Sequence, residues 1–156
     1  RPPRSTLFPY TTLFRSAEAL AEIGGAANLE EAVDLVSYTY DRAHPDLEEG
    51  SLKGKYTNQS EVRNLVFDER QREFLFEGKR YFDLVRRMRR EGSPTNIVNT
   101  YLMRKYTSMS LDETTVRSKL DDKDAIYLPI HEEELRVNPL LVQNRFYMAS
   151  EDISKN

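Results

Sequence analysis

Several classes of protein are excluded by what this 156-residue chain lacks. It contains no cysteine, so it has neither a disulfide framework nor thiol catalysis. No apolar run approaches the roughly 18 residues that a membrane-spanning helix needs. The sequence carries no glycine-rich phosphate loop and no nucleophile motif. Its two histidines, His44 and His131, have no partner at metal-ligand spacing. We therefore expect no catalytic residue, no metal site and no cofactor.

The first sixteen residues, RPPRSTLFPYTTLFRS, lack acidic residues, unlike the rest of the chain. A secretory signal needs a continuous apolar core, which Pro9 and Arg15 interrupt here, and the prolines also disfavour the amphipathic helix of a transit peptide. Back-translated, the stretch matches sixteen consecutive codons in one frame of a common sequencing adapter. We therefore expect residues 1–16 to be an artefactual leader outside the fold. The natural protein would then extend upstream, where any signal or lipid-attachment cysteine would lie.

Charge argues against nucleic-acid binding once this leader is set aside. Residues 1–16 hold three of the 23 basic residues and none of the 26 acidic ones, which leaves a formal charge of −6 (20 against 26). A net acidic chain disfavours bulk binding to phosphate backbones. A length of about 140 residues predicts one domain. We expect it over residues 17–148, followed by a polar tail at 149–156.

Apolar periodicity predicts a helical hairpin over residues 17–43. Gly24 and Gly25 would form its turn, and Asn28, with Glu31 three residues later, would cap the second helix. His44-Pro45 would end this helix, because a residue before proline resists the helical conformation. The hairpin is similar in size to one tetratricopeptide-like unit.

A polar loop over residues 44–59 precedes what the periodicity predicts to be the longest helix, starting at Asn58 or Ser60 and ending near Glu91. Its expected buried residues are Val62, Leu65, Val66, Phe74, Tyr81, Phe82, Val85 and Met88. Gly78 lies inside this helix, which suggests either the close approach of another backbone or a kink. Gly92-Ser93-Pro94 would stop the helix.

The remaining segment has weaker signals. A shorter helix is expected at 95–106, and residues 107–124 are polar without a clear pattern. Residues 125–130, AIYLPI, favour an extended conformation, and HEEEL after them allows one helical turn. NPLLVQNRFY is expected to be irregular, and the tail after Met148 frayed.

The charged segment 67–91 allows two interpretations. Its charges at helical contact spacing are typical of a solvated face, but Glu77, Arg80 and Asp83 alternate with apolar residues and could be partly buried anchors. An enzyme could use Glu73 and Glu77 as paired carboxylates, although neighbouring arginines would neutralise them. The arginines of RRMRRE could bind RNA, but cations at the end of a helix also complement its dipole, and the structural interpretation is favoured.

Two motifs together resemble the carboxy-terminal part of the SusD/RagB family. The first runs through Glu69-Arg70, Glu73-Phe74, Glu77-Gly78, Arg80, Asp83-Leu84 and Arg86. The second runs through Leu128-Pro129-Ile130, Glu134, Asn138-Pro139, Gln143-Asn144 and Tyr147. Three departures are Phe74 for the usual leucine, His131 for a proline, and Arg145-Phe146 for Pro-Gly. The resemblance covers Ala17 to about Tyr147.

The resemblance implies a mostly α fold: a tetratricopeptide-like helical hairpin, one long helix and an irregular, largely extended carboxy-terminal tail. It also implies a non-enzymatic surface lipoprotein of Bacteroidetes, part of polysaccharide utilization, that binds glycans or other nutrients beside a SusC-like TonB-dependent outer-membrane porin. It assigns no ligand-binding residue. Tyr56, Tyr101 and Tyr106 are candidates for stacking on an oligosaccharide, although packing is the simpler role for an aromatic residue. The alternative is a generic helical-repeat domain that binds other proteins.

Overall fold

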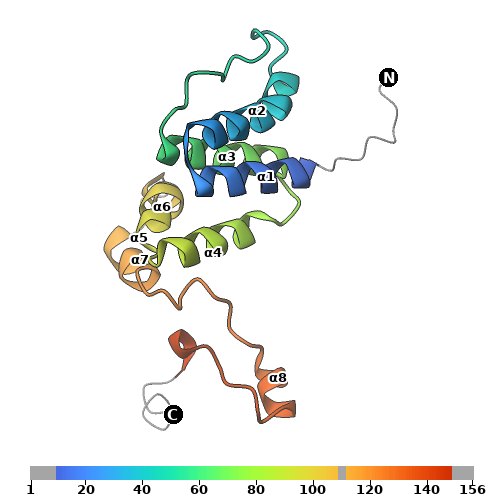
Figure 1. Ribbon diagram of the computed structural model, residues 1–156. Coiled ribbons are helices and arrows are strands. Elements are labelled where there is room, and N and C mark those ends of the chain that lie inside the picture. Colours follow the sequence, from blue (N-terminus) through green and yellow to red (C-terminus); the bar gives the residue numbers. More distant parts are fainter. Residues whose placement is uncertain (1–9, 109–111, 149–156) are drawn as a thin grey trace. The chain divides into compact units, whose positions relative to one another are not determined.

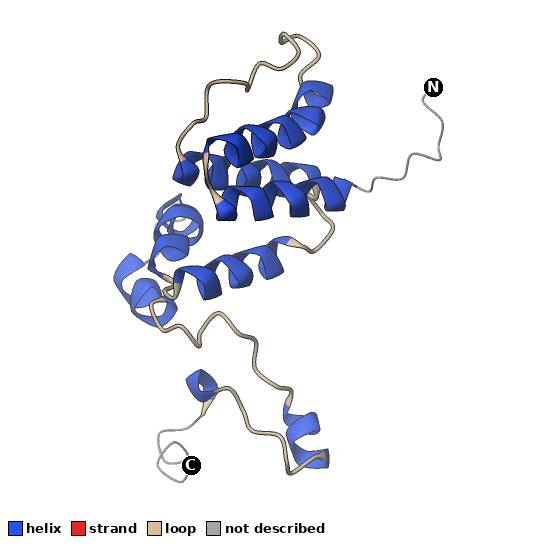
Figure 2. Cartoon of the chain, viewed as in Figure 1, coloured by secondary structure: helices blue, strands red, loops and turns tan. Residues whose placement is uncertain are grey.

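The computed structural model describes residues 10–108 and 112–148, and every regular element in these two ranges is helical (Figure 1, Figure 2). The chain divides into two compact units after Arg80. The elements are α1 (Tyr10–Ile23), α2 (Ala26–Ala43), α3 (Gln59–Glu73), α4 (Arg80–Glu91), α5 (Thr95–Ile97), a π-helical stretch (Val98–Leu102), α6 (Met103–Ser108), α7 (Glu113–Leu120), α8 (Glu132–Val137) and a 3₁₀ turn (Arg145–Tyr147). The predicted mostly α fold is confirmed.

Unit 1 contains the predicted helical hairpin, α1 and α2, with α3 packed against both (Figure 1). Its core is apolar and comes from all three helices, the loop after α2 and the residue after α3: Phe14, Ala17, Ala21, Leu29, Ala32, Val33, Val36, Leu52, Val62, Leu65, Val66 and Phe74. Small residues on α1 allow its backbone to lie close to its neighbours, while α2 and α3 contribute mainly β-branched residues and leucine. Leu52 is 3% exposed and anchors the loop that joins α2 to α3.

The predicted cap of α2 is wrong. The helix begins at Ala26, two residues before Asn28, and its N-cap is Gly25. Gly24 and Gly25 both have positive φ, 75° and 86°, so the chain reverses within two residues and the helix can start at once. The Asn28 side chain instead donates a hydrogen bond of 2.6 Å back to the Gly24 carbonyl. The predicted end of the helix at His44 is confirmed.

The start of α1 differs from the expectation that residues 1–16 lie outside the fold. The helix begins at Tyr10, and Phe14 is 1% exposed in the core. The Phe14 ring meets Phe74 edge-on at 5.5 Å between centroids. The Tyr10 ring lies 4.5 Å from the Arg42 guanidinium carbon. An apolar residue at position 14 continues the buried stripe of Ala17 and Ala21, so the helix takes in this part of the leader whatever its origin.

The prediction of one long helix from residue 58 or 60 to 91 is wrong. Its start is confirmed, because the Asn58 side chain accepts a hydrogen bond of 2.8 Å from the Ser60 N–H. The helix then breaks into α3 and α4 at residues 74–79, where Phe76 and Gly78 adopt positive φ of 68° and 69°. A Cβ added to Gly78 would meet nothing within 4 Å, so this glycine serves the bend and not a close approach.

In unit 2, the predicted helix end at Gly92 is confirmed, whereas the burial of Phe82 and the structure of the polar segment differ from the predictions. α4 ends at Glu91, and Gly92 has φ of 71°. The helix expected at 95–106 is present, with a π-helical stretch inside it. Met88 is buried as predicted, whereas Phe82 is 66% exposed. The helix α7 in the polar segment was not predicted from the sequence. Asp112 caps it by accepting a hydrogen bond from the Thr114 N–H.

The tail after α7 is ordered by polar contacts. Ala125 and Ile126 lie in a turn, contrary to the extended conformation expected for 125–130, and the helical turn after His131 is confirmed as α8. Gln143 bonds to both the N–H and the carbonyl of Ile130, at 2.9 and 2.8 Å. The Asn144 amide donates to the Asp124 and Tyr127 carbonyls. The residues after Met148 lie outside the described part of the chain.

Candidate functional site

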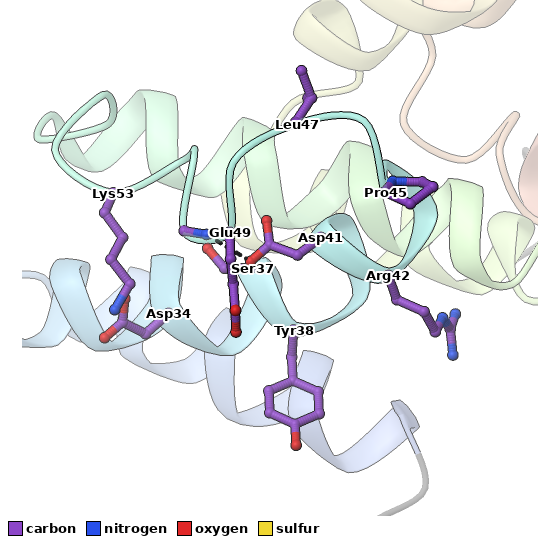
Figure 3. Close-up of a pocket in the computed structure, with 10 residues that line it drawn as sticks. Asp34, Ser37, Tyr38, Asp41, Arg42, Pro45, Leu47, Glu49 and Lys53 are labelled. Carbon is purple, nitrogen blue, oxygen red and sulfur yellow. Dashed lines mark hydrogen bonds and ion pairs between the residues drawn. The ribbon is translucent and has the colours of Figure 1, made fainter. Parts of the chain in front are cut away.

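A groove lies between α2 and the loop that follows it in unit 1 (Figure 3). It has a volume of about 740 Å³, and we call it the α2 groove. Its lining is mostly polar and comes from residues 34–53: Asp34, Ser37, Tyr38, Asp41, Arg42, Pro45, Leu47, Glu49, Gly50 and Lys53. The sequence pattern did not predict this site.

The groove forms because α2 presents one polar face and the loop folds back onto it. Asp34, Ser37, Tyr38 and Asp41 recur at the three- and four-residue spacing that places side chains on one helical face. The Asp41 carboxylate accepts a hydrogen bond of 2.9 Å from the Gly50 N–H. The Lys53 ammonium lies 3.0 Å from an Asp34 oxygen, and Figure 3 shows it reaching from the loop toward that residue. These two contacts fix the loop along the helix.

Most charges of the groove are satisfied within unit 1. The hydrogen bond to Asp34 raises the pKa of Lys53. The hydrogen bond to Glu73 raises the pKa of Arg42, whose Nη2 donates to both Glu73 oxygens at 2.8 and 2.7 Å. The second oxygen of Asp41 is buried and makes no hydrogen bond within the described residues. The groove thus offers carboxylate and hydroxyl acceptors beside Tyr38, whose ring is 75% exposed. This chemistry suits hydrogen bonding and stacking.

A second groove of about 440 Å³ lies between the end of α2 and α3. Its aromatic wall is formed by Tyr40 and His44, stacked at 4.1 Å between centroids, and by Tyr56. Tyr56 also packs against the core. The other two tyrosine candidates lie in unit 2, where Tyr101 accepts a hydrogen bond of 3.1 Å from Arg87 and Tyr106 is half-buried in α6. Tyr56 thus has a packing role and Tyr101 a polar contact, each within its own unit.

The anchor interpretation of segment 67–91 holds for some residues and is wrong for Glu77. Asp83 is 2% exposed and lies 3.0 Å from Arg86. Arg80 is half-buried. Glu77 is exposed and pairs with Lys79 at 2.6 Å. Segment 67–91 is therefore neither uniformly solvated nor uniformly anchored.

The arginines of RRMRRE lie at the end of α4. Arg87 is 8% exposed and reaches Glu91 at 2.8 Å. Arg89 and Arg90 occupy the last turn, where positive charge complements the helix dipole. This placement accords with the structural interpretation of the cluster.

The other candidates for catalysis or metal binding are occupied in structural contacts. Glu73 ends α3 and binds Arg42, whereas Glu77 lies in the turn after α3, so the two do not share a helical face. His44 lies 2.8 Å from the Tyr40 carbonyl at the end of α2. His131 caps α8, its Nδ1 accepting from the Glu133 N–H. Among the described residues, no group of three or more histidine and acidic side chains could hold a metal ion.

Helix length and polarity bear on membrane contact. Within 10–108 and 112–148, none of the helices combines the length and the apolar character that crossing a bilayer requires.

Comparison with known proteins gives one result. A family model described as SusD family matches residues 11–147. Neither curated protein sequences nor solved structures gave a match. The matched region covers most of the 156 residues and contains both motifs singled out in the sequence. The chain therefore belongs to the SusD family.

Proposed function

We propose that this chain is part of a cell-surface protein that binds glycans or related nutrients, without catalysis, and delivers them to a SusC-like TonB-dependent porin. The observation that carries the proposal is the family match over residues 11–147, on an all-helical fold with a tetratricopeptide-like hairpin. The SusD family in general consists of nutrient-binding, non-catalytic surface proteins that associate with such porins. Its members are outer-membrane lipoproteins, and we propose the same location here, with the lipid anchor upstream of this chain.

The geometry of the described residues supports a binding role. The grooves of unit 1 carry acceptors and aromatic rings, while Glu73 and Glu77, the carboxylates considered for catalysis, are held by Arg42 and Lys79. We propose no nucleic-acid partner, because the chain is net acidic.

The experiment starts from the natural gene. Its full-length product would be expressed, titrated against starch, host-glycan, plant-polysaccharide and peptide panels by calorimetry, and tested for co-purification with the porin encoded beside it. We expect binding of one ligand class, a stable complex with the porin, and no release of reducing sugar. Sugar release abolished by Glu73→Gln or Glu77→Gln would overturn the non-enzymatic role. Further helical hairpins upstream without a lipoprotein signal would favour the generic protein-binding domain instead.

The same gene tests our proposal for the domain boundaries. We propose that residues 17–148 are the carboxy-terminal part of a SusD-like domain, that 149–156 are a polar tail and that residues 1–16 derive from adapter DNA. Genomic sequence upstream of the Ala17 codon should then differ from the adapter. It should still encode an apolar residue at the position of Phe14, because the core has a buried site there.

A further inference from the structure

The segment between α3 and α4, residues 74–79, combines unusual backbone geometry with a position at the boundary of the two units. We call it the linking turn. Phe76 has φ of 68°, and no other non-glycine residue among those described has a positive φ. This left-handed conformation places Cβ close to the following carbonyl, so a bulky side chain normally avoids it. Gly78 shares the conformation, with φ of 69°.

Packing of these two residues does not explain the bend. The Phe76 side chain is 96% exposed, so it gains almost no burial from its unfavourable backbone. A Cβ at Gly78 would meet nothing within 4 Å. Since Phe76 and Gly78 make no packing contacts that would stabilise their positive φ, contacts of the neighbouring residues must hold the strained backbone in place.

Those contacts come from the two cations after the bend. The Lys79 ammonium lies 4.2 Å from the centre of the Phe74 ring. The Arg80 guanidinium carbon lies 3.9 Å from the centre of the Phe67 ring, and its Nη1 donates a hydrogen bond of 3.1 Å to the Phe67 carbonyl. Both cations thus hold the turn against α3 and its end through cation–π contacts.

The sequence also favours the alternative, one uninterrupted helix. The turn is rich in helix formers, including Leu75, Glu77 and Lys79. Between the buried Glu69 of α3 and the buried Asp83 of α4, a continuous helix would complete about four turns of roughly 3.6 residues. The buried faces of α3 and α4 would therefore stay in register if the helix ran through.

We propose that the linking turn is a two-state hinge. In the bent state, Phe76 and Gly78 are left-handed and Lys79 and Arg80 hold the turn to α3. In the straight state, α3 continues into α4 as one helix, Phe76 returns to right-handed geometry, and the cation–π contacts are released. The hinge makes the connection between α3 and α4 switchable, so a ligand that binds one state more tightly shifts the population toward that state.

The test uses the full chain, and the absence of cysteine allows two spin labels to be placed at introduced cysteines. The cysteines would be introduced as Ser60→Cys and Arg89→Cys, because Ser60 on α3 and Arg89 on α4 are both exposed. In the straight state their backbones lie roughly 44 Å apart, at about 1.5 Å per residue. Measuring the distance between the two spin labels by electron paramagnetic resonance gives the fraction of molecules in the straight state. The backbone chemical shifts of Phe76 report whether its φ is positive or negative.

Three variants separate the outcomes. Gly78→Ala penalises the bent state and should raise the straight-to-bent ratio roughly tenfold, while Phe76→Gly removes the strain of the bend and should lower the ratio by a similar factor. Gly54→Ala is the control, since Gly54 has φ of 72° and equally open surroundings but lies in the α2–α3 loop. It should leave the ratio unchanged.

The hinge is overturned if Gly78→Ala shows no straight component, or if the ratio is the same in all variants. If Gly78→Ala does not fold, the Phe76→Gly variant still tests whether the hinge exists. A straight component in the parent chain that Phe76→Gly removes supports the hinge, and an unaltered distance distribution refutes it.

Discussion

At the scale of single residues, the burial of Phe14 makes the strongest stability prediction. Its side chain is 1% exposed and packs edge-on against Phe74. Phe14→Ala should lower the free energy of unfolding by about 3–5 kcal/mol, because removing a buried ring loses transfer energy and leaves a cavity. Chemical denaturation followed by circular dichroism measures this loss.

The control for Phe14 lies one residue further along the same helix. Arg15 is exposed, so Arg15→Ala should change stability by no more than about 0.5 kcal/mol. Equal stability of Phe14→Ala and the parent chain would mean that residues 10–16 contribute nothing to the core, as the adapter interpretation expected.

Asp83 makes a second prediction at this scale. Its carboxylate is 2% exposed and pairs with Arg86 at 3.0 Å. Asp83→Ala should cost about 1–3 kcal/mol, because the groups that a buried carboxylate satisfies lose their partner. Glu133 is the matched control, since its pair with Arg136, also three residues apart, has both side chains more than half exposed. Glu133→Ala should cost less than about 1 kcal/mol, and equal losses in both variants would contradict the anchor role of Asp83.

At the scale of elements, α7 should respond to acid through its cap. Asp112 accepts hydrogen bonds from the Thr115 hydroxyl and from the Thr114 N–H, and these lower the pKa of Asp112 below its ordinary 3.8. A carboxyl whose pKa is lower in the folded state stabilises above its unfolded pKa and loses that effect as the pH falls through its folded pKa. Amide signals of α7 should therefore show fraying below pH 3.8 in an NMR titration.

Asp112→Asn separates the cap from the titration. Asparagine caps a helix about as well as aspartate but carries no ionisable proton. The variant should keep α7 folded at neutral pH and remove the acid response of its first turn. Fraying at the same pH in Asp112→Asn would assign the effect to another group.

The elements also show where sequence reasoning succeeds. Helix ends set by local chemistry were predicted, such as Asn58 before α3 and Gly92 after α4. The break at residues 74–79 was not predicted, because the apolar periodicity continues across it. The contacts that accompany the break, those of Lys79 and Arg80 with the rings of Phe74 and Phe67, cannot be read from the periodicity. The α2 groove was missed for a related reason: it requires the loop to return to α2 through the Gly50–Asp41 hydrogen bond.

At the scale of the whole molecule, the family was easier to predict from the sequence than the ligand-binding site. The two motifs that carry the resemblance consist mainly of residues with structural contacts, such as Asp83 with Arg86 and Gln143 with Ile130. Such residues fix the fold shared by a family and leave the ligand undefined. The family could therefore be inferred from the sequence, whereas the ligand-binding residues could not.

The last prediction follows from the division of the chain after Arg80: we expect unit 1 to fold without unit 2. Every buried residue of the main core lies between Phe14 and Phe74, within unit 1. Residues 121–148 of unit 2, by contrast, contain no buried side chain, and polar contacts such as Gln143 with Ile130 order them. A chain of residues 1–80 should therefore be helical and melt cooperatively, although a domain of about this size is only modestly stable. A chain of residues 81–156 should show no cooperative transition, since the buried apolar residues in its described part are only Met88, Pro94, Ile97, Val98 and Met103. Circular dichroism and calorimetry of both chains test this. An unfolded 1–80 chain would show that the hairpin and α3 depend on unit 2 for their stability.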